Sequence, residues 1–229
     1  MANINKKTFF ITGTDTSAGK TVVTAALIRY WQKGGARVAG LKPIASGFEL
    51  RDGRYKNDDI EAIKAANNVP ISDDLINRYA YRQAVAPHIV AQQSQDKIEF
   101  DKIAEDAQQA LLQVDTLLVE GVGGWLVPLN GYKQGYQDIQ ALAQELNFPV
   151  ILVVAMRLGC INHALLTARS IVESGVPFVG WVANFCDAEF DCKEQNIAML
   201  DDKMPVPRLF DMPYHQELSN GVEIIKVNH

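Results

Sequence analysis

Short apolar runs alternate with segments of helical periodicity along most of the 229-residue chain. The apolar runs are continuous rather than alternating in polarity, which is typical of strands covered on both faces. We predict strands at residues 8–12, 37–41, 116–120, 150–155, 178–184 and 206–210. We predict helices at residues 21–33, 58–66, 100–112, 137–146, 163–173 and 191–200. This alternation indicates parallel pairing with right-handed crossovers, and therefore a doubly wound, mainly parallel α/β sheet with helices on both faces.

The stretch 48–99 departs from this pattern, because it is polar, contains scattered aromatic residues and has no clear strand. We predict a helical excursion between the second and third strands. No repeat, low-complexity tract or linker interrupts the sequence, so we expect a single domain over residues 1–229. In such sheets ligands bind beyond the carboxyl ends of the strands, which is where the motifs below fall.

Composition narrows the classes of function. The net charge of −5 argues against a nucleic-acid binder, because phosphate backbones require a basic face. The three cysteines form no C-x-x-C pair and no zinc spacing, which favours a reducing compartment. No apolar stretch is long enough to span a bilayer, and the run in MANINKKTFFITG is too short for a signal peptide. We expect a cytoplasmic protein without nucleic-acid or membrane partners.

The first predicted strand runs into the loop GTDTSAGKT, residues 13–21, which opens a helix. This is the context of a phosphate-binding P-loop. Backbone N–H groups surround the phosphates, Lys20 reaches the β- and γ-oxygens, and the Thr21 hydroxyl ligates magnesium. The loop has five residues between its glycines where the common pattern has four, but its placement supports an ATP site. Asp15, Thr16 and Ser17 either face the phosphates or stabilise the loop and cap the helix.

Charged residues follow the next two strands. Lys42, in GLKPIASG, lies at a strand's carboxyl end and is either a surface lysine or a second cation aimed at the phosphates. Two lysines there suit phosphoryl transfer. Glu120, in LVEGVGGW, is predicted to face magnesium, and its glycines let the backbone approach the ligand. Asp58 and Asp59 open a helix as N-cap and first-turn residues, and either could reach the metal.

Two further segments contribute candidates. Asn162, in the stretch GCINH at residues 159–163, is predicted to cap a helix whose free amides form an anion site. Asn184 ends the fifth strand, and its paired donor and acceptor could read an adenine edge.

Taken together, the motifs resemble those of the dethiobiotin synthetase family. The matching segments are GTDTSAGKT (13–21), GLKPIASG (40–47), APHI (86–89), LVEGVGGW (118–125), PVILVV (149–154), LGCINHALLTA (158–168) and GWVAN (180–184). The five-residue spacing of the P-loop is this family's own form. The resemblance implies a P-loop NTPase-like fold and an ATP-dependent ligase of biotin synthesis. In the family's reaction, 7,8-diaminopelargonate and carbon dioxide or bicarbonate form a carbamate that ATP phosphorylates, and a ureido ring closes.

The same resemblance implies roles for individual residues. The catalytic group would be Lys42, Lys20 and Thr16, and magnesium would be held by Thr21, Asp59 and Glu120. Ser46 would contact the diamine or carbamate. Contacts to ATP would come from Ser17, Ala18, Gly19, Lys20, Thr21, Val22, Asp59, Glu120, Gly121, Val122, Gly123, Asn184, Pro213, Tyr214 and His215. The substrate carboxylate would lie against Gly159, Cys160, Ile161 and Asn162 of the second subunit of a homodimer.

Two other functions fit the same fold. A partitioning-type switch ATPase shares the P-loop, but such proteins usually place an additional lysine early in the loop, which TDTSAGKT lacks. Another small-molecule amidoligase or kinase would differ in the substrate that makes ATP hydrolysis proceed.

Overall fold

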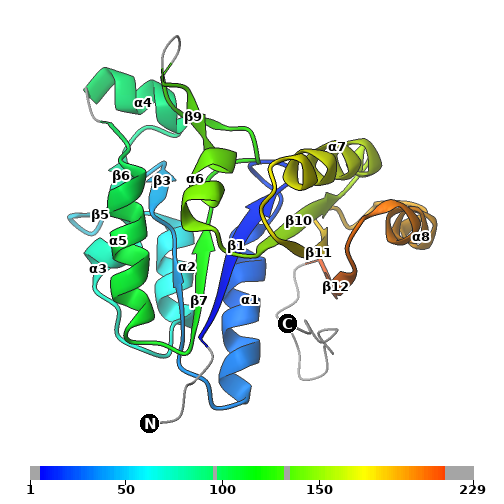
Figure 1. Ribbon diagram of the computed structural model, residues 1–229, viewed down its shortest axis with the longest axis horizontal. Coiled ribbons are helices and arrows are strands. Elements are labelled where there is room, and N and C mark those ends of the chain that lie inside the picture. The colour runs from blue at the N-terminus through cyan, green and yellow to red at the C-terminus, as the bar shows by residue number, and fades with distance from the viewer. Residues whose placement is uncertain (1–5, 95–96, 132–134, 215–229) are drawn as a thin grey trace.

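The computed structural model describes residues 6–94, 97–131 and 135–214. Its centre is a six-stranded parallel sheet in the order β12-β11-β10-β1-β7-β2 (Figure 1). The strands are β1 (Lys7–Gly13), β2 (Val38–Leu41), β7 (Thr116–Glu120), β10 (Val150–Met156), β11 (Phe178–Phe185) and β12 (Arg208–Met212). The predicted parallel α/β sheet is therefore confirmed.

Helices and short strands surround this sheet. The helices are α1 (Lys20–Lys33), α2 (Asp58–Ala66), α3 (Asp73–Ile76), α4 (Pro87–Ser94), α5 (Phe100–Leu111), α6 (Ile139–Leu146), α7 (Cys160–Glu173) and α8 (Lys193–Lys203). The short strands are β3 (Ile44–Ser46), β4 (Glu49–Arg51), β5 (Arg54–Lys56), β6 (Tyr79–Tyr81), β8 (Pro128–Asn130) and β9 (Gln137–Asp138). Within the described ranges, no helix combines the length and apolar character that a membrane span requires.

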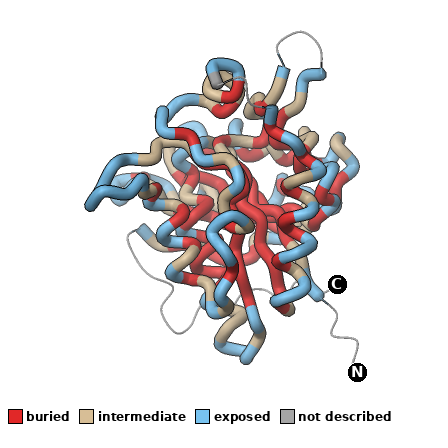
Figure 2. Tube along the Cα trace, turned by 90° about the vertical axis from the view of Figure 1, so that its left-hand side faces the viewer, coloured by how far each residue is buried: buried red, intermediate tan, exposed pale blue. Residues whose placement is uncertain are grey.

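The core lies on both faces of the sheet, as the continuous apolar strands predict (Figure 2). On β1, Phe10 packs into the cluster that includes residues of α5, α6 and α7. Its neighbours Phe9 and Ile11 pack into the opposite cluster, with residues of α1. Because successive side chains of a strand point to opposite faces, apolar residues at consecutive positions require cover on both sides.

All six predicted strands form the sheet, with small shifts at their ends. The largest shift is at the last strand, predicted at 206–210 and observed at Arg208–Met212. Pro207 precedes this strand and lacks an N–H, although its carbonyl accepts a 3.1 Å bond from the N–H of Trp181. The predicted strand at 206–210 thus starts two residues before β12, which begins only after Pro207.

The stretch 48–99, predicted as a helical excursion without a clear strand, contains the helices α2, α3 and α4 but also three short strands that the sequence did not indicate. β4 and β5 form an antiparallel hairpin whose turn, Asp52-Gly53, has φ values of 53° and 75°. That dipeptide is a known hairpin signal. β6 pairs with β3. Three-residue strands that are largely exposed carry too few apolar positions to register as a pattern.

Candidate active site

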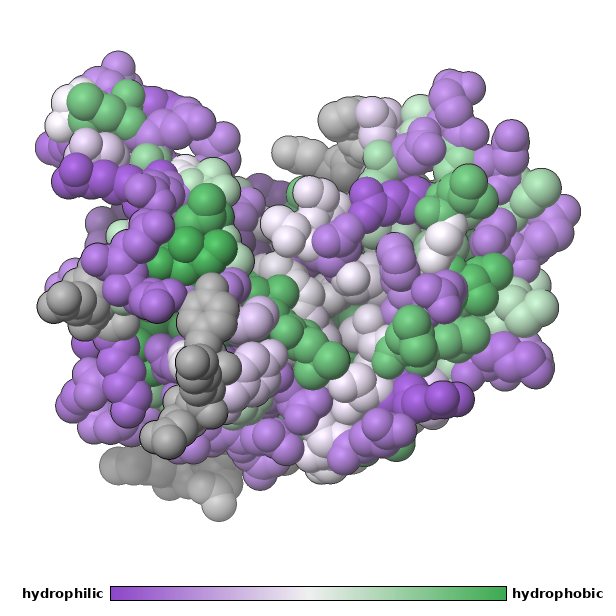
Figure 3. All heavy atoms as spheres, turned by 90° about the horizontal axis from the view of Figure 1, so that it is seen from above, coloured by the Kyte–Doolittle hydropathy of each residue, from purple (hydrophilic) through white to green (hydrophobic). Residues whose placement is uncertain are grey.

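The loops that follow β1, β2 and β7 meet beyond the carboxyl ends of their strands. β1 lies between β7 and β10 in the sheet, and β2 lies beside β7. The backbone of the loop after β7 lies close to the end of β1, since a Cβ added at Gly124 would lie 3.6 Å from the carbonyl oxygen of Gly13. The view from above the molecule shows a surface hollowed between two projecting lobes (Figure 3).

The P-loop connects β1 to α1, and its last residue before the helix is Gly19, with φ of 82°. Lys20 turns back into this loop, where its Nζ donates to the carbonyl oxygens of Asp15 at 3.1 Å and Thr16 at 3.2 Å. The pKa of Lys20 is lowered to about 8, mainly by burial; the charge of Glu120 opposes this shift and the charge of Lys42 adds to it. The Lys20 ammonium thus lies in a setting that an added anion would stabilise.

Two contacts fix the loop from outside. The Nδ2 of Asn184, at the end of β11, donates a 2.7 Å bond to the carbonyl of Ala18. On the other side, Arg157 forms an ion pair with Asp15, whose second oxygen accepts a 2.7 Å bond from the N–H of Thr16. The amide nitrogen of Asn184 is therefore used by the protein itself, and its predicted adenine contact stays a prediction.

Glu120 is fully buried at the end of β7 and accepts three side-chain hydrogen bonds. Its Oε1 accepts from the hydroxyl of Thr21 at 2.7 Å and from Nζ of Lys42 at 2.8 Å. Its Oε2 accepts from the hydroxyl of Thr24 at 2.8 Å. Glu120 therefore lies at the end of its strand, as the sequence predicted, and both of its oxygens accept hydrogen bonds from Lys42 or from the first turns of α1.

Lys42 also pairs with Asp59, at the first turn of α2. Burial by itself would lower the pKa of Lys42, but the charges of Glu120 and Asp59 outweigh it and raise the pKa. Burial would likewise raise the pKa of Asp59, but the charge of Lys42 and its hydrogen bond to Asp59 lower it. Lys42 is thus a fixed cation and Asp59 a fixed anion at neutral pH.

The structure separates the two adjacent aspartates of α2. Asp58 is exposed and pairs with Arg51 on the surface, whereas Asp59 faces Lys42. The prediction that one of them caps this helix is wrong. Asn57 is the N-cap, and its side chain accepts bonds from the N–H groups of Asp59 at 3.1 Å and Ile60 at 3.2 Å.

A cavity of 340 Å³ lies between the P-loop, Lys42 and Asp59. Its lining is Thr16, Ser17, Gly19, Lys20, Thr21, Val22, Lys42 and Asp59, all of which the sequence analysis had named. Ser46 is half-buried on β3, four residues beyond Lys42. The hydroxyl of Thr21 and the carboxylates of Asp59 and Glu120 are hard oxygen donors, the type that Mg²⁺ binds together with phosphate oxygens. These donors fit a magnesium ion beside the P-loop.

The glycine-rich loop after β7 runs beside the same site. The N–H of Gly121 donates a 2.9 Å bond to the carbonyl of Ile11, which continues the pairing of β7 with β1. Val122 is half-buried, and Gly123 adopts a φ of 68°. These residues are not among those that line the cavity, so their predicted ATP contacts stay predictions.

The segment Gly159–Asn162 forms the start of α7, which begins at Cys160 rather than at the predicted residue 163. The prediction that Asn162 is the N-cap is wrong. Gly159 takes that position with φ of 92°, and Asn162 lies exposed in the first turn. The N–H of Cys160 already donates to the carbonyl of Arg157 at 2.9 Å. Cys160 is buried and Ile161 half-buried, and none of the four residues lines the P-loop cavity.

The C-terminal candidates follow β12. Pro213 is half-buried and Tyr214 is exposed, and neither lines the cavity. His215 lies outside the described residues.

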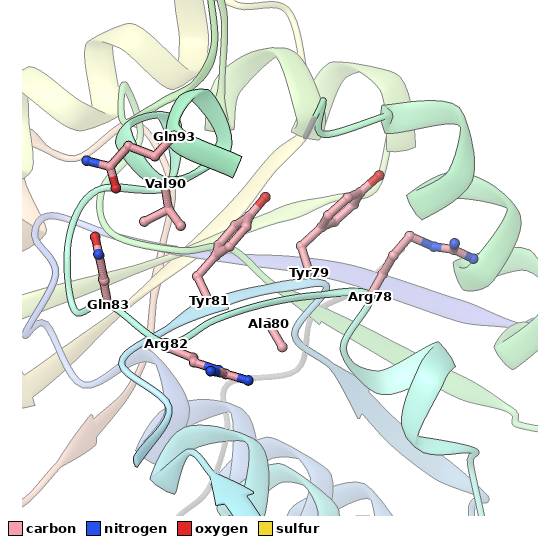
Figure 4. Close-up of a pocket in the computed structure, with 8 residues that line it drawn as sticks. All are labelled: Arg78, Tyr79, Ala80, Tyr81, Arg82, Gln83, Val90 and Gln93. Atoms are coloured by element: carbon pink, nitrogen blue, oxygen red, sulfur yellow. The ribbon is translucent and has the colours of Figure 1, made fainter. Parts of the chain in front are cut away.

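A second cavity, of 590 Å³, lies between β6 and α4 (Figure 4). Tyr81 rises from the strand on the side of Val90 and Gln93 of the helix, whereas the ring of Tyr79 points away from them. The hydroxyl of Tyr79 accepts a 2.9 Å bond from the N–H of Glu99. The two arginines of this cavity already have partners, since Arg78 pairs with Asp106 and the Arg82 guanidinium lies 4.1 Å from the centre of the Tyr55 ring. The cavity therefore offers mainly aromatic and amide groups.

Two residues that contact the site were not predicted from the sequence, Thr24 and Arg157. Thr24 follows Thr21 by three positions in α1, a spacing that places two side chains on one helix face. Arg157 follows directly after β10, at the same edge of the sheet as the P-loop. Both positions were available from the predicted elements, although neither residue belongs to a recognisable motif.

Comparison with solved structures gives the class of protein. The chain superimposes on the signal recognition particle receptor FtsY of Elizabethkingia anophelis, in complex with GDP, with a TM-score of 0.57 at 13% identity. That match covers 97% of this chain and 61% of FtsY. The MinC:MinD cell division complex of Aquifex aeolicus gives 0.56 at 16% identity, over 93% of this chain and 83% of the other. The fold and the loop define a P-loop nucleotide-binding α/β protein.

Sequence comparison identifies the family. Residues 7–222 match the profile of a family described as an AAA domain. ATP-dependent dethiobiotin synthetase BioD of Cellvibrio japonicus is 45% identical over 92% of this chain and 90% of its own length. The same enzyme of Nitrosospira multiformis is 40% identical over 96% of both chains, and that of Xylella fastidiosa 39% identical over 90% and 89%. The chain belongs to the ATP-dependent dethiobiotin synthetase family.

Proposed function

We propose that this chain closes the ureido ring of dethiobiotin from 7,8-diaminopelargonate and carbon dioxide, using ATP. The observation that carries the proposal is the buried Lys42, whose ammonium group lies at the cavity formed by the P-loop. A second cation beside a phosphate site stabilises charge that develops on a transferred phosphoryl group. The family membership supplies the substrate, which the geometry of a phosphate site does not specify.

The reaction needs no nucleophile from the protein. One amine of the diamine adds to carbon dioxide and loses a proton, which gives a carbamate. A carbamate oxygen attacks the γ-phosphorus of ATP, ADP leaves, and a carbamic-phosphoric anhydride forms. The second amine then attacks the anhydride carbonyl, phosphate leaves, and the ring closes. The protein's contribution is positioning and charge: Lys20 and the loop amides hold the phosphates, Lys42 lies beside carbamate and γ-phosphate, and Thr16 and Ser46 contact the reacting groups.

The proposed magnesium site is Thr21, Asp59 and Glu120. A bound Mg²⁺ ion would neutralise phosphate charge during the transfer. Lys42 bonds to both carboxylates, and the hydroxyl of Thr21 bonds to the carboxylate of Glu120. The proposal therefore requires that these carboxylates exchange part of their contact with Lys42 for contact with the metal.

We also propose a cytoplasmic, single-domain protein that works as a homodimer, with Gly159–Asn162 of one subunit at the substrate carboxylate of the other. Exposed apolar side chains near this segment support an interface. Leu158 is 95% exposed and Leu166 of α7 is 58% exposed. Covering such side chains is the usual driving force of subunit association.

The test is ADP release in the presence and absence of 7,8-diaminopelargonate and bicarbonate, with dethiobiotin identified by mass spectrometry. We expect ADP and dethiobiotin to form in equal amounts, and only when both substrates are present. A switch ATPase would release ADP without the diamine. Another ligase or kinase would release it only with a different acceptor, and either result would exclude the proposed reaction.

A further inference from the structure

Thr24 is a fully buried hydroxyl residue of α1 that lies one helical turn beyond Thr21. Its Oγ1 lies 2.8 Å from Oε2 of Glu120 and 2.9 Å from the carbonyl oxygen of Lys20. Thr24 does not line the P-loop cavity, so its effect on bound ligands must pass through another residue.

The two contacts of Thr24 differ in kind. A bond to the carbonyl four residues earlier is common for a threonine in a helix and needs no functional reason. The bond to Glu120 joins residues 96 positions apart and ties α1 to the end of β7. The carbonyl and the carboxylate are both acceptors, and the single hydroxyl proton of Thr24 is shared between them. The carboxylate is the charged acceptor and the shorter contact, which favours donation to Glu120.

The donors around Glu120 are divided between its two oxygens. Oε1 accepts from Thr21 and Lys42, the two partners that also line the cavity. Oε2 accepts from Thr24, which lies on the buried side. A carboxylate held at both oxygens cannot rotate about its terminal bond without losing a hydrogen bond. The contact with Thr24 therefore helps to keep Oε1 against Thr21 and Lys42, which line the cavity, although Glu120 itself does not.

We propose that Thr24 is a positioning residue that anchors Oε2 of Glu120 and thereby presents Oε1 to magnesium at the P-loop. This inference rests on the proposed function, in which Glu120 is a magnesium ligand. Hydrogen bonds to ligating side chains generally change metal affinity by about 10- to 100-fold. The contact to Glu120 is also charge-assisted, which places it among the stronger hydrogen bonds.

The test compares Thr24→Val, which removes the hydroxyl at similar volume, with Thr24→Ser, which keeps it. ADP binding is measured by calorimetry at increasing magnesium concentrations and again with EDTA. We expect Thr24→Val to raise the magnesium midpoint by about 10- to 100-fold and to leave ADP affinity in EDTA unchanged. Thr24→Ser should restore the midpoint. If Thr24→Val does not fold, Thr24→Ala is measured in its place.

Glu120→Gln separates this inference from the function on which it rests. A raised midpoint in Glu120→Gln, together with an unchanged midpoint in Thr24→Val, would overturn the role of Thr24 and leave the metal site intact. An equal loss of ADP affinity with and without magnesium in Thr24→Val would assign Thr24 to the P-loop structure and overturn the inference as well. An unchanged midpoint in Glu120→Gln would overturn both the metal assignment and the inference.

Discussion

The ammonium group of Lys42 lies 2.8 Å from Oε1 of Glu120, although the two residues are 78 positions apart in the chain. Each residue stands at the carboxyl end of its strand, and β2 and β7 are neighbours in the sheet. Both side chains are buried, so each charge depends on the other for compensation. The arrangement brings an ammonium group and a carboxyl group together at the edge of the phosphate site.

Replacing Lys20 by Ala should abolish ATP-dependent turnover without unfolding the protein. Within the described structure its Nζ donates only to carbonyls of its own loop, and burial lowers its pKa, so the folded state gains little from its charge. We expect a fall of about 100-fold or more in turnover, as for loss of a group that stabilises transition-state charge. Thermal denaturation checks the fold. Wild-type turnover in a folded variant would contradict the P-loop assignment.

Lys42→Gln should reduce kcat far more than it weakens ATP binding. A charge that serves the transition state lowers kcat, whereas a ground-state contact mainly alters KM. We expect a decrease of about 100-fold in kcat, measured in steady-state kinetics over a range of ATP concentrations. The variant should also be less stable, because Glu120 loses its cationic partner. A change confined to KM would make Lys42 a binding residue.

Asp59→Asn and Asp58→Asn form a matched pair on one helix turn. Asp59 faces Lys42, while Asp58 pairs with Arg51 at the surface. Only Asp59→Asn should raise the magnesium concentration required for half-maximal turnover, by about tenfold, which corresponds to losing one contact to a charged group. If only Asp58→Asn raised the magnesium requirement, Asp58 rather than Asp59 would be the ligand, and our assignment would be wrong.

Gly19→Ala should disrupt nucleotide binding through Asn184. Gly19 has φ of +82°, and a Cβ there would overlap the Nδ2 of Asn184. Gly35→Ala is the control, since Gly35 has the same φ of +82° but no atom within 4 Å of its added Cβ. Both variants carry backbone strain of about 1 kcal/mol. Calorimetry with ADP should detect weakened binding in Gly19→Ala only, and equal binding in both would leave Asn184 without a role in holding the loop.

Mixing Asn162→Trp with Lys42→Gln should restore activity if subunits share active sites. Asn162 is exposed, so a tryptophan there should not disturb its own subunit. Each variant alone should be nearly inactive. Random exchange gives hybrid dimers in which one of the two sites is intact, so we expect about one quarter of wild-type activity. No recovery, with hybrid dimers demonstrated by native mass spectrometry, would mean that each subunit builds its own site.

Much of this site could be predicted from the sequence because of the parallel sheet. The carboxyl ends of parallel strands lie at one edge, so the P-loop, Lys42 and Glu120 had to converge once their strands were recognised. The predictions that failed concern helix starts and short strands. The N-cap of α2 is Asn57, which stands next to the equally plausible Asp58, and the N-cap of α7 is Gly159, three residues before the plausible Asn162. Propensity alone does not choose between such neighbours.

The sequence by itself determined the sheet, the phosphate loop and the charged residues at its edge, because apolar periodicity and glycine spacing are local properties of the chain. Only the tertiary structure decided which aspartate of α2 faces Lys42, since adjacent residues of a helix point about 100° apart and the cap at Asn57 sets their direction. The same holds for Asn184 on Ala18 and for Thr24 on Glu120. Those hydrogen bonds join segments distant in sequence, and their partners are fixed by strand register and helix packing rather than by any local pattern.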